Sequence, residues 1–74
     1  MFTIYCYILS QEPSEPATYH SETEFECLEV GISSANRFLG QHTHAKVSIQ
    51  DEYGQALQRV KLSDTDTGWL IVSD

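Results

Sequence analysis

The fold is decided by residues 21–40, which read SETEFECLEVGISSANRFLG. Ser21 is followed three residues later by Glu24, a pattern in which both side chains cap the first backbone N–H groups of a helix. Apolar side chains then recur at spacings of three and four residues, at Phe25, Leu28, Ile32, Ala35 and Leu39, with Phe38 beside them. Gly40 is a residue type that often ends helices. The segment therefore predicts one amphipathic helix that begins after Ser21 and ends at Gly40.

The residues before this helix predict a strand and a loop. Residues 2–9 are a continuous run rich in Ile, Tyr and Phe, which favours a strand inside a sheet. Residues 10–16 contain both prolines and no large apolar side chain, so they predict a loop. Residues 17–20 leave room for a short second strand.

Three more strands are expected after the helix. Residues 45–50 alternate as a half-buried strand does, and a loop at residues 52–54 with a left-handed Gly54 would place Ile49 opposite Leu57. Arg59 and Lys61 then break the alternation, which favours a bulge or an edge position. Residues 63–68 predict a polar turn, and residues 69–72 predict a last short strand.

These elements predict one small α+β domain over residues 1–74. One amphipathic helix is expected to pack on one face of a four- or five-stranded, mainly antiparallel sheet, in the order β-(β)-α-β-β-β. The other face of the sheet is expected to stay open.

Composition limits the classes of partner. The 74 residues contain 4 Lys and Arg against 11 Asp and Glu, and the net charge is −7. Phosphates and anionic lipids repel such a chain, so neither direct nucleic-acid binding nor membrane binding is expected. Cys6 and Cys27 are too few for a disulfide framework, and the first residues lack the features of a signal peptide. A cytoplasmic protein with reduced, buried cysteines is therefore expected.

The acidic residues are concentrated in the first half of the chain. Residues 1–36 hold six acids and no Lys or Arg, whereas residues 37–74 hold five acids and all four basic residues. On the predicted helix, Glu22, Glu26 and Glu29 would form one row, next to Glu12 and Glu15 of the preceding loop. We interpret these five residues as a docking strip for a basic protein surface. The alternative is a solvated helix start, whose dipole favours carboxylates.

Tyrosines give a second candidate surface. Alternation along the first strand points Phe2, Ile4 and Cys6 one way, and Tyr5 and Tyr7 the other. If the helix covers the first set, both tyrosines lie on the open face and are candidate partner-binding residues, because tyrosine is enriched in interfaces. The alternative is that the loop over residues 10–20 covers them.

Signatures of catalysis and of cofactor binding are missing from the sequence, so no enzymatic activity and no cofactor are expected. No phosphate-binding loop, dinucleotide fingerprint or nucleophile elbow is present. The best metal-binding element is His42-x-His44, but structural zinc sites usually pair ligands at other spacings. Cys6, His20 and Cys27 each stand alone in the sequence.

The acidic helix, the aromatic first strand and the glycine-turn hairpin resemble the short β-α-β-β proteins of bacteria and their phages. Small acidic phage inhibitors, including anti-CRISPR proteins, are similar in size and charge. This resemblance implies a stoichiometric inhibitor that mimics nucleic acid and blocks a basic site on a host complex. The alternatives are a structural domain that homodimerises through its open sheet face, and a zinc-binding module.

Overall fold

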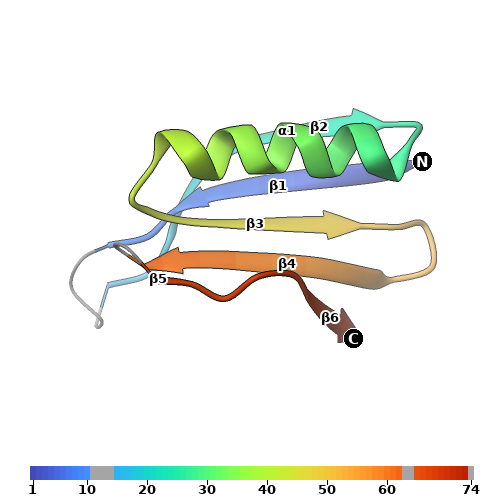
Figure 1. Cartoon of the computed structure of the whole chain (residues 1–74). Coiled ribbons are helices and arrows are strands. Elements are labelled where there is room, and N and C mark those ends of the chain that lie inside the picture. The colour runs from blue at the N-terminus through green and yellow to red at the C-terminus, as the bar shows by residue number, and fades with distance from the viewer. Residues whose placement is uncertain (11–14, 63–64, 74) are drawn as a thin grey trace.

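A computed structural model of the chain describes residues 1–10, 15–62 and 65–73 (Figure 1). Its elements are, in order, β1 (Phe2–Ile8), β2 (Thr18–Phe25), α1 (Leu28–Gln41), β3 (His44–Gln50), β4 (Gln55–Leu62), β5 (Thr65–Asp66) and β6 (Leu70–Ser73). The strands form one antiparallel sheet in the order β2-β1-β3-β4-β5, and β6 pairs with the other end of β4. This architecture is the predicted α+β fold.

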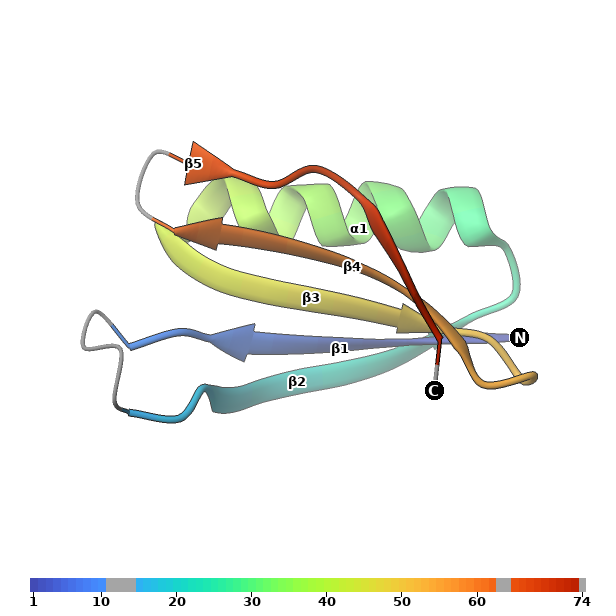
Figure 2. The same cartoon turned by 90° about the horizontal axis from the view of Figure 1, so that it is seen from below.

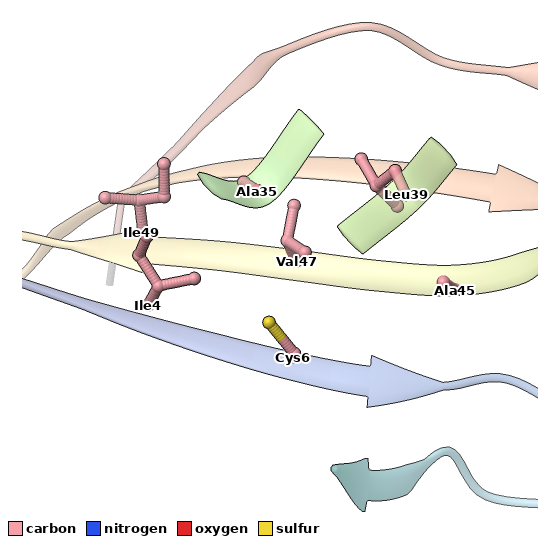
Figure 3. Packing of buried hydrophobic residues seen from close by; sticks show 7 residues of the cluster. All are labelled: Ile4, Cys6, Ala35, Leu39, Ala45, Val47 and Ile49. Atoms are coloured by element: carbon pink, nitrogen blue, oxygen red, sulfur yellow. The ribbon is translucent and has the colours of Figure 1, made fainter. Parts of the chain in front are cut away.

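The core lies between α1 and two of the inner strands, β1 and β3. The helix covers one face of the sheet, and no other element of the described residues covers the opposite face (Figure 1, Figure 2). Figure 3 shows the buried side chains, which come from β1 (Ile4, Cys6), α1 (Ala35, Leu39) and β3 (Ala45, Val47, Ile49). Leu28 and Ile32 pack against this cluster but remain partly exposed.

The predicted start of the helix is wrong. Residues 18–25 form β2, which pairs with β1 from Thr18 opposite Ile8 to Phe25 opposite Phe2. The backbone around Ser21 and Glu24 is therefore used in a sheet ladder, and these two side chains form no capping box. The helix instead begins after Cys27, which makes no side-chain capping bond, and it runs through Gly40 to Gln41.

The hairpin of β3 and β4 is confirmed. Gly54 has a φ of 86°, and Ile49 lies opposite Leu57. The break in alternation beyond Leu57 is not a bulge, because the ladder of β4 with β3 continues without a shift to the end of both strands. The predicted edge position is also wrong, since the other side of β4 pairs with β6 at residues 55–58 and with β5 at Lys61 and Leu62. Arg59 and Lys61 lie opposite Val47 and Ala45, so they point to the helix side of the sheet and flank the core.

Two other regions differ from expectation or lie outside the description. Thr65 and Asp66 form the short strand β5 within the predicted polar turn, and Gly68 has a φ of 72°. Residues 11–14 of the predicted proline loop, including Glu12, lie outside the described residues.

Both cysteines are free, but Cys27 is exposed, so its expected burial is wrong. Burial raises the pKa of the Cys6 thiol above its ordinary value.

Candidate functional site

The pairing of β1 with β2 gathers acidic and aromatic side chains on the face that α1 does not cover. Ile4 and Cys6 of β1 point to the core, so the residues between and beside them point to the open face. Residues directly opposite one another in neighbouring strands share a face. Glu22 lies opposite Tyr5, Glu24 opposite Thr3, and Tyr19 opposite Tyr7. We call this group of residues the acid–tyrosine patch: Tyr5, Tyr7, Tyr19, Glu22 and Glu24.

Direct contacts hold part of the patch in place. The hydroxyl of Tyr19 donates a hydrogen bond to Oε1 of Glu22 at 3.1 Å. The rings of Tyr7 and Tyr19 meet edge to face, with centroids 6.3 Å apart and planes at 75°. Desolvation and the neighbouring Glu22 carboxylate raise the pKa of the Tyr19 phenol above its ordinary value. The phenol therefore stays protonated, as a hydrogen-bond donor, to a higher pH than an ordinary tyrosine does.

The patch already binds a cation of this chain. Nζ of Lys46, which lies opposite Tyr7 on β3, is 5.4 Å from the centre of the Tyr7 ring. This distance falls within the range of cation–π attraction, about 6 Å from the centroid. Lys46 therefore occupies one face of the Tyr7 ring in the free protein.

The side chains on the open face change from acidic and aromatic near β2 to apolar near β6. Its middle row runs through Glu22, Tyr5, Ser48, Gln58 and Leu70. Ser48 is buried at the centre of this row, and its hydroxyl has no hydrogen-bond partner among the described residues. Leu62 and Leu70, toward the β4 and β6 side, are 50% and 51% exposed. The face is thus acidic and aromatic at one edge and apolar at the other.

The predicted row of Glu22, Glu26 and Glu29 on one helix is wrong. Glu22 belongs to β2, Glu26 lies in the connection after it, and Glu29 lies in the first turn of α1. All three side chains are exposed, but they lie on different elements. Glu15 is exposed as well, and its Oε2 accepts a hydrogen bond from the Ser10 hydroxyl at 2.9 Å.

The structure thus groups three of the predicted partner-binding residues, Tyr5, Tyr7 and Glu22. It adds Tyr19 and Glu24, which sequence reasoning missed. The signal for Glu24 was its distance of two positions from Glu22, which places both on one face of a strand. Alternation could not find Tyr19, which stands three positions from Glu22 and shares its face only because the register shifts between Ser21 and Tyr19.

Two basic residues of β4, Arg59 and Lys61, are engaged in contacts on the helix side of the sheet. Nε of Arg59 donates to both carboxylate oxygens of Asp66, at 2.9 and 3.1 Å, and Nη2 donates to Oδ2 at 2.6 Å. Nη1 of Arg59 donates to the Asn36 side chain of α1. Nζ of Lys61 donates to the Leu39 carbonyl at 3.2 Å, near the end of the helix. These contacts tie α1 to β4 and β5 and keep two cations away from the acid–tyrosine patch.

We expect Asp66→Asn to lower the free energy of unfolding at pH 7 by up to about 1 kcal/mol, the upper end for an exposed pair. Arg59 and the Gly68 N–H lower the pKa of Asp66 from 3.8 to about 2. A carboxylate with a lowered pKa stabilises the fold above its ordinary pKa, and this contribution is lost as the pH falls from about 4 to about 2. The difference between wild type and variant should therefore shrink over that interval.

Urea unfolding of both proteins at pH 7 and near pH 2 measures this difference. Glu26→Gln, which removes the same charge at an exposed position, controls for net charge. A stability difference that is the same at both pH values would contradict the assignment.

Two hollows lie on the helix side of the sheet. The first has a volume of about 190 Å³ and is mainly apolar. Asp51 lies at its wall, and Oδ1 of this residue accepts hydrogen bonds from the backbone N–H groups of Tyr53 and Gln55. The second, of about 350 Å³, is lined by Arg59, Lys61 and Asp66 together with Asn36, Leu39 and Gly40 of α1. Neither hollow is lined by a nucleophile next to a base.

The predicted His42-x-His44 element does not act as a unit. His44 alternates with the fully buried Ala45, so it lies on the open face, whereas His42 contacts Phe38 of α1. Among the described residues, no group of three or more His, Cys, Asp or Glu side chains is placed to hold a metal ion.

Comparison with protein families, curated proteins and solved structures finds no match for the chain. In the part of the chain that the structure describes, no helix has the length and apolar character needed to cross a lipid bilayer.

Proposed function

We propose that the protein is a non-enzymatic binding module whose acid–tyrosine patch docks on a basic protein surface. One observation carries this proposal: Glu22 lies opposite Tyr5 and accepts a hydrogen bond from Tyr19, on a face that no other element among residues 1–10, 15–62 and 65–73 covers. Carboxylates pair with guanidinium groups through two parallel hydrogen bonds, and aromatic faces attract the same cations. An Arg- or Lys-rich surface therefore satisfies both halves of the patch.

The proposed consequence of docking is inhibition. Basic surfaces of this kind are typical of nucleic-acid-binding proteins, which use Lys and Arg to neutralise phosphates. A carboxylate-bearing face that occupies such a surface excludes the phosphates and blocks the site in a stoichiometric manner. In this proposal the protein acts in the cytoplasm without a cofactor, as the likeness to small acidic phage inhibitors in size and charge implies.

We expect the double variant Glu22→Gln, Glu24→Gln to bind an arginine-rich peptide about tenfold more weakly than wild type, which corresponds to about 1.4 kcal/mol. Association should slow and the salt dependence of binding should flatten, because charges at a docking site steer the encounter. Fluorescence anisotropy at low and high salt measures both effects.

The matched control is Glu26→Gln, Glu29→Gln. This variant removes the same two charges, but from the connection after β2 and the first turn of α1 instead of the open face. It should bind the peptide nearly as wild type does. If both double variants lose the same amount of peptide affinity, the loss comes from net charge alone. That result would contradict a specific patch.

A second candidate function is homodimerisation through the open face. The specific observation is that Leu62 and Leu70 of the apolar half are about half exposed. Truncated apolar anchors at an interface weaken association, so Leu62→Ser, Leu70→Ser should convert a dimer to a monomer in sedimentation velocity. A wild-type protein that sediments as a monomer at all salt concentrations would exclude this function and leave the docking proposal standing.

A further inference from the structure

A pair of histidines from distant parts of the chain meets at one edge of the sheet. His20 of β2 and His42, which follows α1, have ring centroids 5.8 Å apart with planes at 65°. Phe38 of α1 lies against both rings, with centroids 5.0 Å from His20 and 4.4 Å from His42. We call His20 and His42 the histidine pair.

An irregularity in β2 explains why His20 points to the helix side. The register between β1 and β2 runs from Cys6 opposite Ser21 directly to Tyr7 opposite Tyr19, so His20 has no opposite residue. A bulge of this kind inserts one extra residue and re-aims its side chain. Ser21 shares the helix side with Cys6, and the bulge turns His20 toward the same side, where it meets Phe38.

The spacing of the pair is close to that of two ligands of one zinc ion. Zinc–nitrogen bonds of about 2.0–2.1 Å at a tetrahedral angle place the centres of two imidazole rings roughly 5 Å apart. The observed separation is 5.8 Å, so a small movement of the rings is enough for both to bind one ion. Imidazole is also a common ligand for zinc and its neighbours in the transition series.

Ser21 supplies an orienting contact. Nδ1 of His20 lies 3.0 Å from the hydroxyl oxygen of Ser21. When Nδ1 carries the proton, the Nδ1–H donates a hydrogen bond to this oxygen, and Nε2 presents its lone pair as a ligand. Contacts of this kind fix the tautomer and ring orientation of metal-binding histidines.

We propose that the histidine pair is one half of a zinc site, and that the same pair of a second copy completes it. Structural zinc takes four protein ligands, and the described residues bring no third potential ligand of the His, Cys, Asp or Glu type to the pair. A two-fold symmetric dimer applies the same surface twice and supplies four imidazoles.

The position of the pair allows a second copy to approach. β2 is the edge strand of the sheet (Figure 2), and His20 is exposed on it. Each copy carries a charge of −7, so two copies repel each other when no cation bridges them. A divalent ion at the shared site opposes this repulsion, and association is expected to depend on zinc. This proposal is independent of the acid–tyrosine patch.

The test combines calorimetric titration with Zn²⁺ and sedimentation velocity. Wild type should bind one zinc ion per two chains and change from monomer to dimer, whereas Mg²⁺, which prefers oxygen ligands, should do neither. His20→Phe and His42→Phe keep a ring against Phe38 but lose the nitrogen ligands. Each should lower zinc affinity at least tenfold and abolish the zinc-dependent dimer. Ser21→Ala should lower the affinity by about tenfold with the stoichiometry unchanged.

His44→Phe is the matched control, because it removes a histidine from the open face and should bind zinc as wild type does. Loss of binding in His44→Phe with retention in His20→Phe would overturn the assignment, as would a lack of zinc binding in wild type. One zinc per chain without dimerisation would overturn the shared site. If a Phe variant fails to fold, the Gln variant at that position provides the same comparison.

Discussion

Replacing Leu39 by alanine is expected to lower the free energy of unfolding by about 2–5 kcal/mol, the usual range for a buried leucine. Leu39 is 2% exposed and reaches from α1 toward the core side chains of β3 (Figure 3). The truncation leaves a cavity that the rigid sheet cannot fill. Domains have total stabilities of only about 5–15 kcal/mol, so the loss is a large part of the whole.

Leu28→Ala is the comparison that makes this prediction specific. Leu28 belongs to the same apolar stripe in sequence, but it is partly exposed and lines the smaller hollow. Its truncation should destabilise the fold less than that of Leu39. Urea unfolding followed by circular dichroism measures both values. Equal losses would contradict the burial difference between the two ends of the helix.

The error at the start of the helix has a physical reason. Ser21, Glu24 and Phe25 satisfy the local signals of a capped amphipathic helix, and Phe25 has the right spacing to Leu28 and Ile32. The same residues also alternate as a strand. What decides between the two is the ladder that β1 offers to residues 18–25, a long-range pairing that no local pattern reveals. The hairpin was predictable because Gly54 and the alternation around it act within a few residues.

In the candidate site, too, local patterns predicted the position of some residues, whereas others depend on pairing between distant segments. Alternation along β1 places Tyr5 and Tyr7 on the open face, as predicted from the core residues between them. Glu22 joins them through β2 and not through a helix row. The histidine pair depends on a bulge and on the packing of α1 against β2, so spacing in the sequence could not reveal it.

Replacing Gly31 by leucine is expected to destabilise the domain by about 1–3 kcal/mol, the usual range for an overfilled core. Gly31 is buried where α1 crosses β1, and a Cβ atom there would lie 3.2 Å from Cδ1 and 3.8 Å from Cγ1 of Ile4. The end of the Ile4 side chain can shift to admit one methyl group. Gly31→Ala should therefore stay within about 1 kcal/mol of wild type, because its better helix propensity offsets the contact.

Gly40→Leu is the matched substitution, since Gly40 is exposed on the same helix and a Cβ there would meet no atom within 4 Å. Leucine has a higher helix propensity than glycine, so this variant should be more stable than wild type by up to about 1 kcal/mol. Replacing glycine by leucine is thus expected to destabilise the fold at position 31 and to stabilise it at position 40. Thermal and urea unfolding of both variants measures the two changes in stability. A stabilising Gly31→Leu would mean that α1 lies farther from β1 than the contact with Ile4 requires, because propensity alone would then decide both outcomes.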